Sequence, residues 1–299
     1  MKTASVILDN DSISLSNNDV QAILQRRSAG ESLGALAREV GLSWQRLWTL
    51  LYGASSAVAR KPEAAVPVLT VTRPDAPLAE KYRPGSLDAL WGQPAVVKVL
   101  KKFAAQPCPT AFLFEGDTGT GKTSAALSLA SAIGCDLAQR PQEFGGVYSI
   151  ASGEQSADAV RETARLMHNC PFSGSGWKVV IVNEADRMAR AAETIWLDVL
   201  EAIPGQTVII FTTNESARLS QRFMDRCTRL RFESDADRLR ASATSLAAAV
   251  WQAETGKRPD AAKLHAFIQS TEQNGQISFR RVMQELTVAI GQEDSSPCP

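Results

Sequence analysis

The fold is decided by one stretch of the chain, Gly116-Asp117-Thr118-Gly119-Thr120-Gly121-Lys122-Thr123. It matches G-x-x-x-x-G-K-[ST] at every fixed position. An apolar run at Ala111–Phe114 leads into it, and good helix formers at Ser124–Ile133 follow it. Glycines in such a loop let successive backbone N–H groups turn toward phosphate oxygens, and the helix N-terminus adds positive potential. The stretch therefore predicts a phosphate-binding loop between a strand and a helix.

The loop predicts ATP and Mg²⁺ as ligands. Lys122 would reach the β- and γ-phosphates and act in catalysis, and Thr123 would hold Mg²⁺. Ser124, the next residue, belongs to the same expected contact set. The alternative is a glycine-rich turn without a ligand, and it is disfavoured because strand, loop and helix occur together.

Apolar strand-like runs alternate with helical stretches around this loop. The runs are Ala111–Phe114, Val147–Ile150, Val179–Val182, Val208–Thr212 and Leu230–Phe232. Such alternation predicts an α/β fold with a parallel sheet covered on both faces. The expected organisation is a helical module at 1–53, an Ala/Pro-rich linker at 54–77, the ATPase core at 78–234, a helical lid at 235–291 and a disordered tail at 292–299.

Composition limits the cellular setting. The 299 residues suit two or three modules, and 32 basic residues balance 32 acidic ones, so any DNA affinity must come from local patches. The five cysteines form no C-x-x-C pair, which disfavours a zinc site. The chain starts without a basic segment followed by an apolar one, and no run approaches the length of a membrane span. We expect a soluble, cytoplasmic protein of bacterial or phage origin with no membrane partner.

A second acidic motif follows the run Val179–Val182. P-loop ATPases usually place an Asp at the end of this strand, to orient water around Mg²⁺, and then a Glu that polarises the attacking water. Here the two positions are Asn183 and Glu184. An amide oxygen still accepts a hydrogen bond from a metal-bound water but supplies no charge. We therefore predict a catalytic role for Glu184, a contact of Asn183 with Mg²⁺ through water, intact nucleotide binding and slow hydrolysis. The alternative is that these side chains only decorate a strand end.

The segment Ala79–Pro84, followed by Trp91-Gly92-Gln93, resembles the E-K-Y-R-P…G-Q signature of replication factor C small subunits and related clamp loaders, which are AAA+ ATPases. Ile150–Glu154 and Val160–Glu162 are similar to the N-A-S-D-E…R-E segment of the same family. The resemblance implies an AAA+ core with a helical lid. It also implies that Tyr82, Arg83 and Pro84 flank the adenine and the phosphates of ATP.

Three further positions resemble that family. Asn214 follows the run Val208–Thr212 and matches the sensor-1 position, which contacts the γ-phosphate or the attacking water. Asp225-Arg226-Cys227 resembles the S-R-C motif, which implies that Arg226 is a finger inserted into a neighbouring subunit's ATP site. Phe279-Arg280-Arg281 resembles the start of the sensor-2 helix, with a longer spacing from Gly275, and implies Arg280 as the lid arginine.

Residues before the linker fit a helix-turn-helix. Ala37 supplies a small residue in the first helix, Gly41 a turn, and Leu47 and Leu50 an inner face in the second helix. That second helix would expose four side chains able to reach bases and phosphates in a major groove: Ser43, Gln45, Arg46 and Thr49. The alternative is a three-helix docking module that contacts protein.

Together these patterns predict a DNA-associated AAA+ ATPase that couples ATP binding and hydrolysis to assembly on DNA, in a clamp-loader-like role in replication or recombination. Arg161 and Arg165, one helical turn apart, fall where the resemblance implies contact with DNA inside a ring. Expected partners are DNA and identical or homologous AAA+ subunits in a ring or filament, with a sliding clamp or another replication or recombination protein as a further candidate. The alternatives are a target-selection ATPase of Mu-type transposition, an ATP-binding switch or scaffold with weak hydrolysis, and a regulator of transcription.

Overall fold

The computed structural model describes residues 71–294 without a gap, together with residues 19, 22, 23, 25, 26, 33–41, 47, 67 and 69. The chain divides into two compact units, Met1–Ala59 and Arg60–Pro299. All the strands of the described residues and all the residues around the phosphate-binding loop belong to the second unit.

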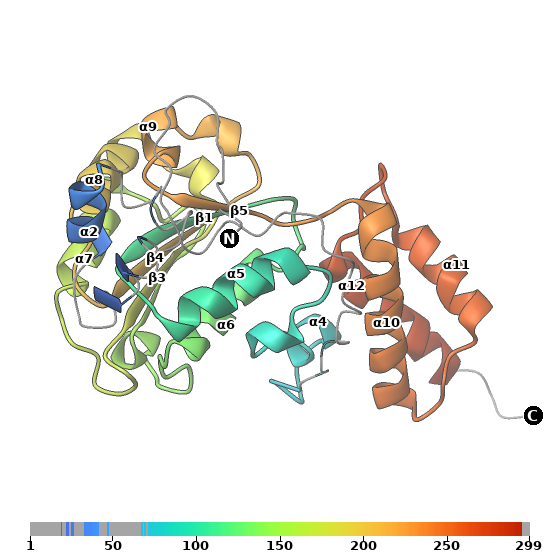
Figure 1. The fold of residues 1–299 in the computed structure, drawn as a ribbon. Coiled ribbons are helices and arrows are strands. Elements are labelled where there is room, and N and C mark those ends of the chain that lie inside the picture. Colours follow the sequence, from blue (N-terminus) through green and yellow to red (C-terminus); the bar gives the residue numbers. More distant parts are fainter. Residues whose placement is uncertain are drawn as a thin grey trace, which may run out of the picture. The chain divides into compact units, whose positions relative to one another are not determined.

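A five-stranded parallel sheet forms the centre of the second unit (Figure 1). Its strands are β1 (Thr110–Glu115), β2 (Val147–Ile150), β3 (Lys178–Val182), β4 (Thr207–Thr213) and β5 (Thr228–Arg231), in the order β2-β3-β4-β1-β5. The predicted α/β class is confirmed. The predicted last run is shifted, because β5 ends at Arg231 and Phe232 lies beyond it, although its N–H still donates to the Glu115 carbonyl at 2.7 Å.

Helices cover both faces of the sheet (Figure 1). The helices of this part are α5 (Pro94–Ala105), α6 (Lys122–Ala132), α7 (Ala157–Leu166), α8 (Arg190–Glu201) and α9 (Gln221–Met224). Alternate side chains of β1 point to opposite faces, as a pleated strand requires. Leu113 joins the buried cluster under α7, α8 and α9, whereas Phe112 packs edge-on against Phe103 of α5 with ring centroids 5.0 Å apart.

The C-terminal helices form a separate lid layer, which consists of α10 (Ala236–Thr255), α11 (Ala261–Thr271) and α12 (Phe279–Asp294). Its buried cluster also includes Leu78, Tyr82 and Trp91. The short helix α4 (Leu78–Lys81) therefore packs on the lid, and Figure 1 shows it beside α10 and α12. Helix α12 runs to Asp294, beyond the lid boundary predicted at residue 291.

Short 3-10 turns connect the larger elements at η2 (Leu87–Ala89), η3 (Gln142–Gly145), η4 (Ala185–Arg187) and η5 (Ser216–Arg218). The last residues before α4 are also fixed to it. The Thr72 hydroxyl donates to the carbonyls of Glu80 at 3.0 Å and Lys81 at 3.2 Å. Among the helices formed by the described residues, none is long and apolar enough to cross a membrane.

The described part of the N-terminal unit contains helix α2 (Leu33–Glu39). Ala37 and Leu47 are buried, and Gly41 has a φ of 70°, which is the left-handed conformation that a glycine turn supplies. These positions agree with the pattern on which the helix-turn-helix was predicted. The expected DNA contacts Ser43, Gln45, Arg46 and Thr49 lie outside the described residues, so the helix-turn-helix stays a prediction.

Phe211 of β4 stabilises the sheet through an aromatic cluster. Its ring packs edge-on against Trp196 at 5.0 Å and Phe223 at 4.7 Å, and all three side chains are fully buried. We expect Phe211→Ala to lower the free energy of unfolding by about 3–5 kcal/mol, measured by urea denaturation. The control Phe172→Ala, at a residue that is 82% exposed, should change it by no more than about 0.5 kcal/mol. Equal effects of the two substitutions would contradict this account.

Candidate nucleotide-binding site

The phosphate-binding loop occupies the turn between β1 and α6. Three of its glycines have positive φ, namely Gly116 at 144°, Gly119 at 80° and Gly121 at 97°. A Cβ on Gly116 would meet the Phe232 carbonyl oxygen at 2.8 Å, and one on Gly119 would meet Ser278 Oγ at 2.0 Å. The loop is therefore pressed between the residue after β5 and the residue before α12. The backbone contact at Gly116 leaves no room for a side chain there, and the positive φ favours glycine at both positions.

Lys122, the first residue of α6, points its ammonium group into the loop. Nζ donates to the carbonyls of Gly116 at 2.6 Å and Asp117 at 2.7 Å and to Asn214 Oδ1 at 2.9 Å. Burial lowers the pKa of Lys122 to about 8. Nearby carboxylates, of which Asp117 has the largest effect, act in the opposite direction and raise it. The structure thus joins the predicted loop lysine to Asn214 at the end of β4. Phosphate oxygens are anionic acceptors that a buried ammonium of this kind binds strongly.

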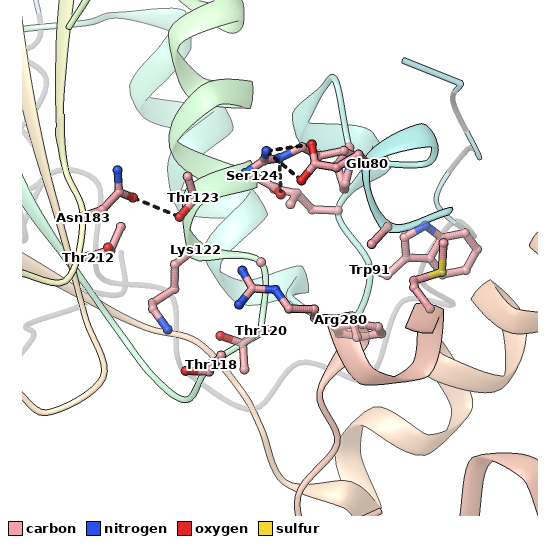
Figure 2. A pocket seen from close by; sticks show the side chains of 18 of the residues that line it. Glu80, Trp91, Thr118, Thr120, Lys122, Thr123, Ser124, Asn183, Thr212 and Arg280 are labelled. Carbon is pink, nitrogen blue, oxygen red and sulfur yellow. Dashed lines mark hydrogen bonds and ion pairs between the residues drawn. The ribbon is translucent and has the colours of Figure 1, made fainter. Parts of the chain in front are cut away.

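A second pair of predicted residues meets beside the loop. Thr123 Oγ1 donates to Asn183 Oδ1 at 3.1 Å (Figure 2). The NH₂ of the same amide faces the other way, 3.4 Å from Ser149 Oγ on β2. A hydroxyl and an amide oxygen turned toward each other are hard oxygen donors of the kind that suits Mg²⁺ and its water shell. These two residues therefore fit the ion expected from the sequence.

Glu184 follows Asn183 in a strained backbone conformation. Its φ is 52° and its ψ is 56°, which are left-handed values that residues other than glycine rarely adopt. Its N–H donates to Thr212 Oγ1 at 3.1 Å. The carboxylate accepts a hydrogen bond from Ser152 Oγ at 2.5 Å and pairs with Arg187 Nε at 3.1 Å. The side chain that was predicted to polarise water is thus held by two groups of the same chain.

Asp186 fixes Asn214, and the sequence alone did not identify it. Its Oδ1 accepts hydrogen bonds from Thr213 Oγ1 at 2.7 Å and from the Asn214 N–H at 3.2 Å. These bonds tie the end of β4 to the turn after β3, so that the Asn214 side chain faces Lys122. The signal in the sequence was only an acidic residue two positions after Glu184.

A cavity of about 450 Å³ opens between the loop, the carboxyl ends of β3 and β4, and the lid. The predicted residues that line it are Tyr82, Arg83, Pro84, Thr118, Gly119, Thr120, Gly121, Lys122, Thr123, Ser124, Asn183, Glu184, Asn214 and Arg280. Three other predicted residues, Gly116, Asp117 and Arg226, are not among the described residues that line this cavity.

One end of the cavity is apolar and was not predicted. Its side chains come from three distant segments, and they are Leu90, Trp91, Leu246, Phe279 and Met283. An apolar wall beside a phosphate-binding loop is suited to the flat face of a nucleotide base. Trp91 and Phe279 lay inside motifs of the sequence, but nothing there indicated that their side chains line a cavity.

Tyr82 and Arg83 occupy the same rim of the cavity in different ways. The Tyr82 hydroxyl donates to the Glu254 carboxylate on α10, and burial raises the pKa of this tyrosine. Glu254 also pairs with Lys81 at 2.7 Å. Arg83 pairs with Glu80 at 3.1 Å and lies 3.4 Å from Ser124 Oγ. Tyr82 therefore links this rim to the lid, whereas Arg83 links it to the first turn of α6.

The lid is connected directly to the phosphate-binding loop. The Phe279 N–H donates to the Gly119 carbonyl at 3.1 Å, and Gln276 Nε2 donates to Asp117 Oδ2 at 2.9 Å. These bonds place the start of α12 over the loop. Figure 2 shows the Arg280 side chain extending from α12 toward Lys122, and its charge contributes to the lowered pKa of that lysine.

The remaining predicted residues lie outside the cavity. Arg226 follows α9, where Nη1 donates to the Arg222 carbonyl at 2.9 Å and Nη2 pairs with Glu201 of α8. Arg161 and Arg165 lie on α7 with exposed side chains. Each has an acidic neighbour three residues earlier: Arg161 contacts Asp158 at 2.7 Å, and Arg165 contacts Glu162 at 3.7 Å.

Comparisons with known proteins agree on the class of this core. Residues 92–236 match the family described as DNA polymerase III, delta subunit. Replication factor C subunit 3 of Saccharomyces cerevisiae is 33% identical over 159 residues, which are 52% of this chain and 45% of that protein. The replication factor C small subunit of Thermofilum pendens is 33% identical over 155 residues, 52% of this chain and 46% of that protein. The chain thus spans less than half the length of these relatives.

A solved structure shares the fold. The RuvB Holliday junction branch migration motor of Thermotoga maritima superimposes with a TM-score of 0.52 over 71% of this chain and 72% of that chain, at 15% identity. Residues of this chain that form the parallel sheet, the phosphate-binding loop and the lid therefore share the fold of that motor.

The buried ammonium predicts how nucleotide affinity depends on pH. Bound triphosphate stays ionised above neutral pH and would raise the pKa of Lys122 from its value of about 8 in the free protein. The ammonium's contribution to ATP affinity is complete below the pKa of the free protein. It is lost as the pH rises from that value through the raised pKa of the complex. ATP affinity should therefore be constant near neutral pH and fall about tenfold per unit at higher pH.

Titration of a fluorescent ATP analogue between about pH 7 and pH 9.5 tests this linkage. Lys122→Arg is the control because a guanidinium stays charged over the whole range. Its affinity should be lower than that of the natural protein at neutral pH and should not change with pH. A constant affinity in the natural protein would contradict the role given to the Lys122 ammonium.

Proposed function

We propose that this chain, whose core is an AAA+ ATPase module of the clamp-loader type, binds ATP with Mg²⁺ in the cavity and couples its hydrolysis to assembly on DNA. One observation carries the proposal. Lys122 from the loop, Asn214 from β4 and Arg280 from the lid converge on one cavity although they are far apart in the sequence. Three polar side chains of this kind around a phosphate-binding loop serve to bind phosphates and to stabilise charge during phosphoryl transfer.

The ligands would be held in two parts of the cavity. The phosphates would replace the backbone carbonyls as hydrogen-bond acceptors of Lys122, while the base would lie against the apolar wall near Trp91. Thr123 and Asn183 would hold the Mg²⁺ ion and its water. When bound, Mg²⁺ neutralises charge on the β- and γ-phosphates. Glu184 would accept the proton of the attacking water once its carboxylate leaves Ser152.

We propose that Arg226 acts on the nucleotide of a neighbouring subunit. Arg226 is not one of the described residues that line the cavity of its own chain. Its guanidinium lies instead at the surface between α8 and α9. A finger supplied by a neighbour requires head-to-tail contacts between copies or homologous subunits, and these generate a ring or a filament. Such an assembly would bring Arg161 and Arg165 of successive subunits to a common surface, where DNA phosphates would compete with Asp158 and Glu162 for them.

The test is ATP turnover by the purified chain with primed, duplex and single-stranded DNA, next to Glu184→Gln and Arg226→Ala. Each variant should lose about 100-fold or more in turnover while still binding ATP. The decisive sample is a mixture of the two inactive variants. In a 1:1 mixture about a quarter of the head-to-tail contacts join an intact Glu184 to an intact Arg226, so partial activity should return.

Other outcomes identify other functions. Tight ATP binding without turnover on any DNA would refute the motor and favour an ATP-binding switch or scaffold. Arg226→Ala with full turnover would refute a finger between subunits. DNA-stimulated turnover that follows one palindromic site would favour a regulator of transcription. The choice between replication, recombination and Mu-type target selection depends on which DNA and which protein partner stimulate the activity.

Asn183 predicts a specific gain of function. Asp at this position would accept the same hydrogen bond from Thr123 and would add the negative charge that P-loop ATPases usually have there. We expect Asn183→Asp to raise Mg²⁺ affinity and turnover by about 10- to 100-fold, measured as turnover against Mg²⁺ concentration. Asn169→Asp, an equal charge change at an exposed residue of the loop after α7, should leave both unchanged. No gain in Asn183→Asp would contradict the view that the missing charge limits hydrolysis.

A further inference from the structure

Gln155 contacts the acidic motif from outside the cavity. It lies in the turn between β2 and α7, and only 5% of its surface is exposed. Its side-chain Nε2 donates hydrogen bonds to the carbonyl of Asn183 and, at 3.2 Å, to the carbonyl of Glu184. One buried amide group thus binds the backbone of both residues that were expected to act on Mg²⁺ and on water.

The orientation of this amide is fixed by chemistry. Both partners are carbonyl oxygens, which only accept hydrogen bonds, so the NH₂ group must face them. The Oε1 atom is consequently turned into the interior, where it has no hydrogen-bond partner among the described residues. An unpaired buried oxygen is unfavourable, and an apolar side chain of the same length would avoid it. The polar residue is therefore explained by what its NH₂ group holds.

What the NH₂ group holds is a conformation that the chain disfavours. Glu184 has a φ of 52°, and a non-glycine residue keeps such a conformation only where its surroundings fix it. Its N–H is fixed by Thr212 Oγ1 at 3.1 Å, and its carbonyl is fixed by Gln155. The preceding residue is fixed in the same way, since the Asn183 N–H donates to the Ile150 carbonyl at 3.1 Å and the Asn183 carbonyl accepts from Gln155.

We infer that Gln155 is a positioning residue for ATP hydrolysis. It holds the Asn183–Glu184 backbone in the one conformation that directs Asn183 Oδ1 toward Thr123 and leaves the Glu184 side chain at the cavity. Gln155 is not among the described residues that line the cavity, so its effect passes through the two backbone carbonyls. The inference rests on the proposed ATPase function of Glu184.

Two substitutions test it. Gln155→Met keeps the length of the side chain and removes both donors, and Gln155→Glu keeps the shape but turns an acceptor oxygen toward the carbonyls. Thr163→Val is the control. Thr163 is also a buried polar residue, and in the part of the chain that the structure describes its hydroxyl bonds only to the Ala159 carbonyl within α7, at 2.8 Å.

Both Gln155 variants should lower kcat by about tenfold or more, since small displacements of reacting groups are costly. The Kd for ATP should stay within about twofold of the natural value, because Gln155 does not reach the nucleotide. Hydrogen exchange should become faster in the peptide that spans residues 182–188 and stay unchanged elsewhere in the sheet. Thr163→Val should alter none of these quantities.

The readouts separate this inference from the proposed function. Natural kcat and natural exchange at residues 182–188 in both Gln155 variants would overturn the positioning role while leaving the ATPase intact. A parallel loss of kcat, ATP affinity and protection throughout the sheet would overturn it too, because that pattern marks general destabilisation. If the unmodified chain shows no turnover, the proposed function fails, and local exchange at residues 182–188 still decides whether Gln155 holds this backbone.

Discussion

The buried charge of Lys122 is the constraint on which the rest of the site depends. An ammonium taken out of water must be surrounded by acceptors, and here they come from two parts of the chain: the loop carbonyls of Gly116 and Asp117, and the Asn214 amide. Asn214 is in turn fixed by Asp186 from the turn after β3. The ends of β1, β3 and β4 are thereby held together by polar contacts at the edge of a sheet whose interior is apolar. This edge is also where ligands bind in open α/β sheets.

The lid is a wall of the same site and is built partly from residues that precede the sheet. Leu78, Tyr82 and Trp91 share a buried cluster with α10, α11 and α12. The segment that leads into the core is therefore packed against the lid, while Gln276 and Phe279 bind the lid to the loop. A nucleotide in the cavity would contact the sheet, this segment and the lid at once. Its binding energy can consequently act on the orientation of the lid.

The sequence predicted those parts of the structure that depend on local pattern. Five apolar runs gave the strands, with an error at Phe232, whose burial against Phe114 gives it the apolar character of a strand residue. Lys122 and Thr123 were predicted from the fixed spacing of the loop motif, and Asn183 from its place at the end of an apolar run. Trp91, Asp186 and Gln155 were not assigned, since their roles depend on contacts between distant segments. A glutamine in a polar turn gives no sign that its amide holds Glu184.

Asn183, which stands where P-loop ATPases usually have an Asp, should weaken the metal site more than the nucleotide site. In the proposed complex, Lys122 and Arg280 would balance most of the phosphate charge, and among the described residues neither is hydrogen-bonded to Asn183. A divalent ion next to Thr123 depends on nearby negative charge, and the Glu184 carboxylate beside it is already paired with Arg187. An amide in place of a carboxylate thus removes attraction for Mg²⁺ while leaving the phosphate cradle unchanged. Under the proposed function, ATP binding and ATP hydrolysis would therefore be separable in this chain: the cradle would favour a long-lived ATP state, and the charge at residue 183 would set the rate of leaving it.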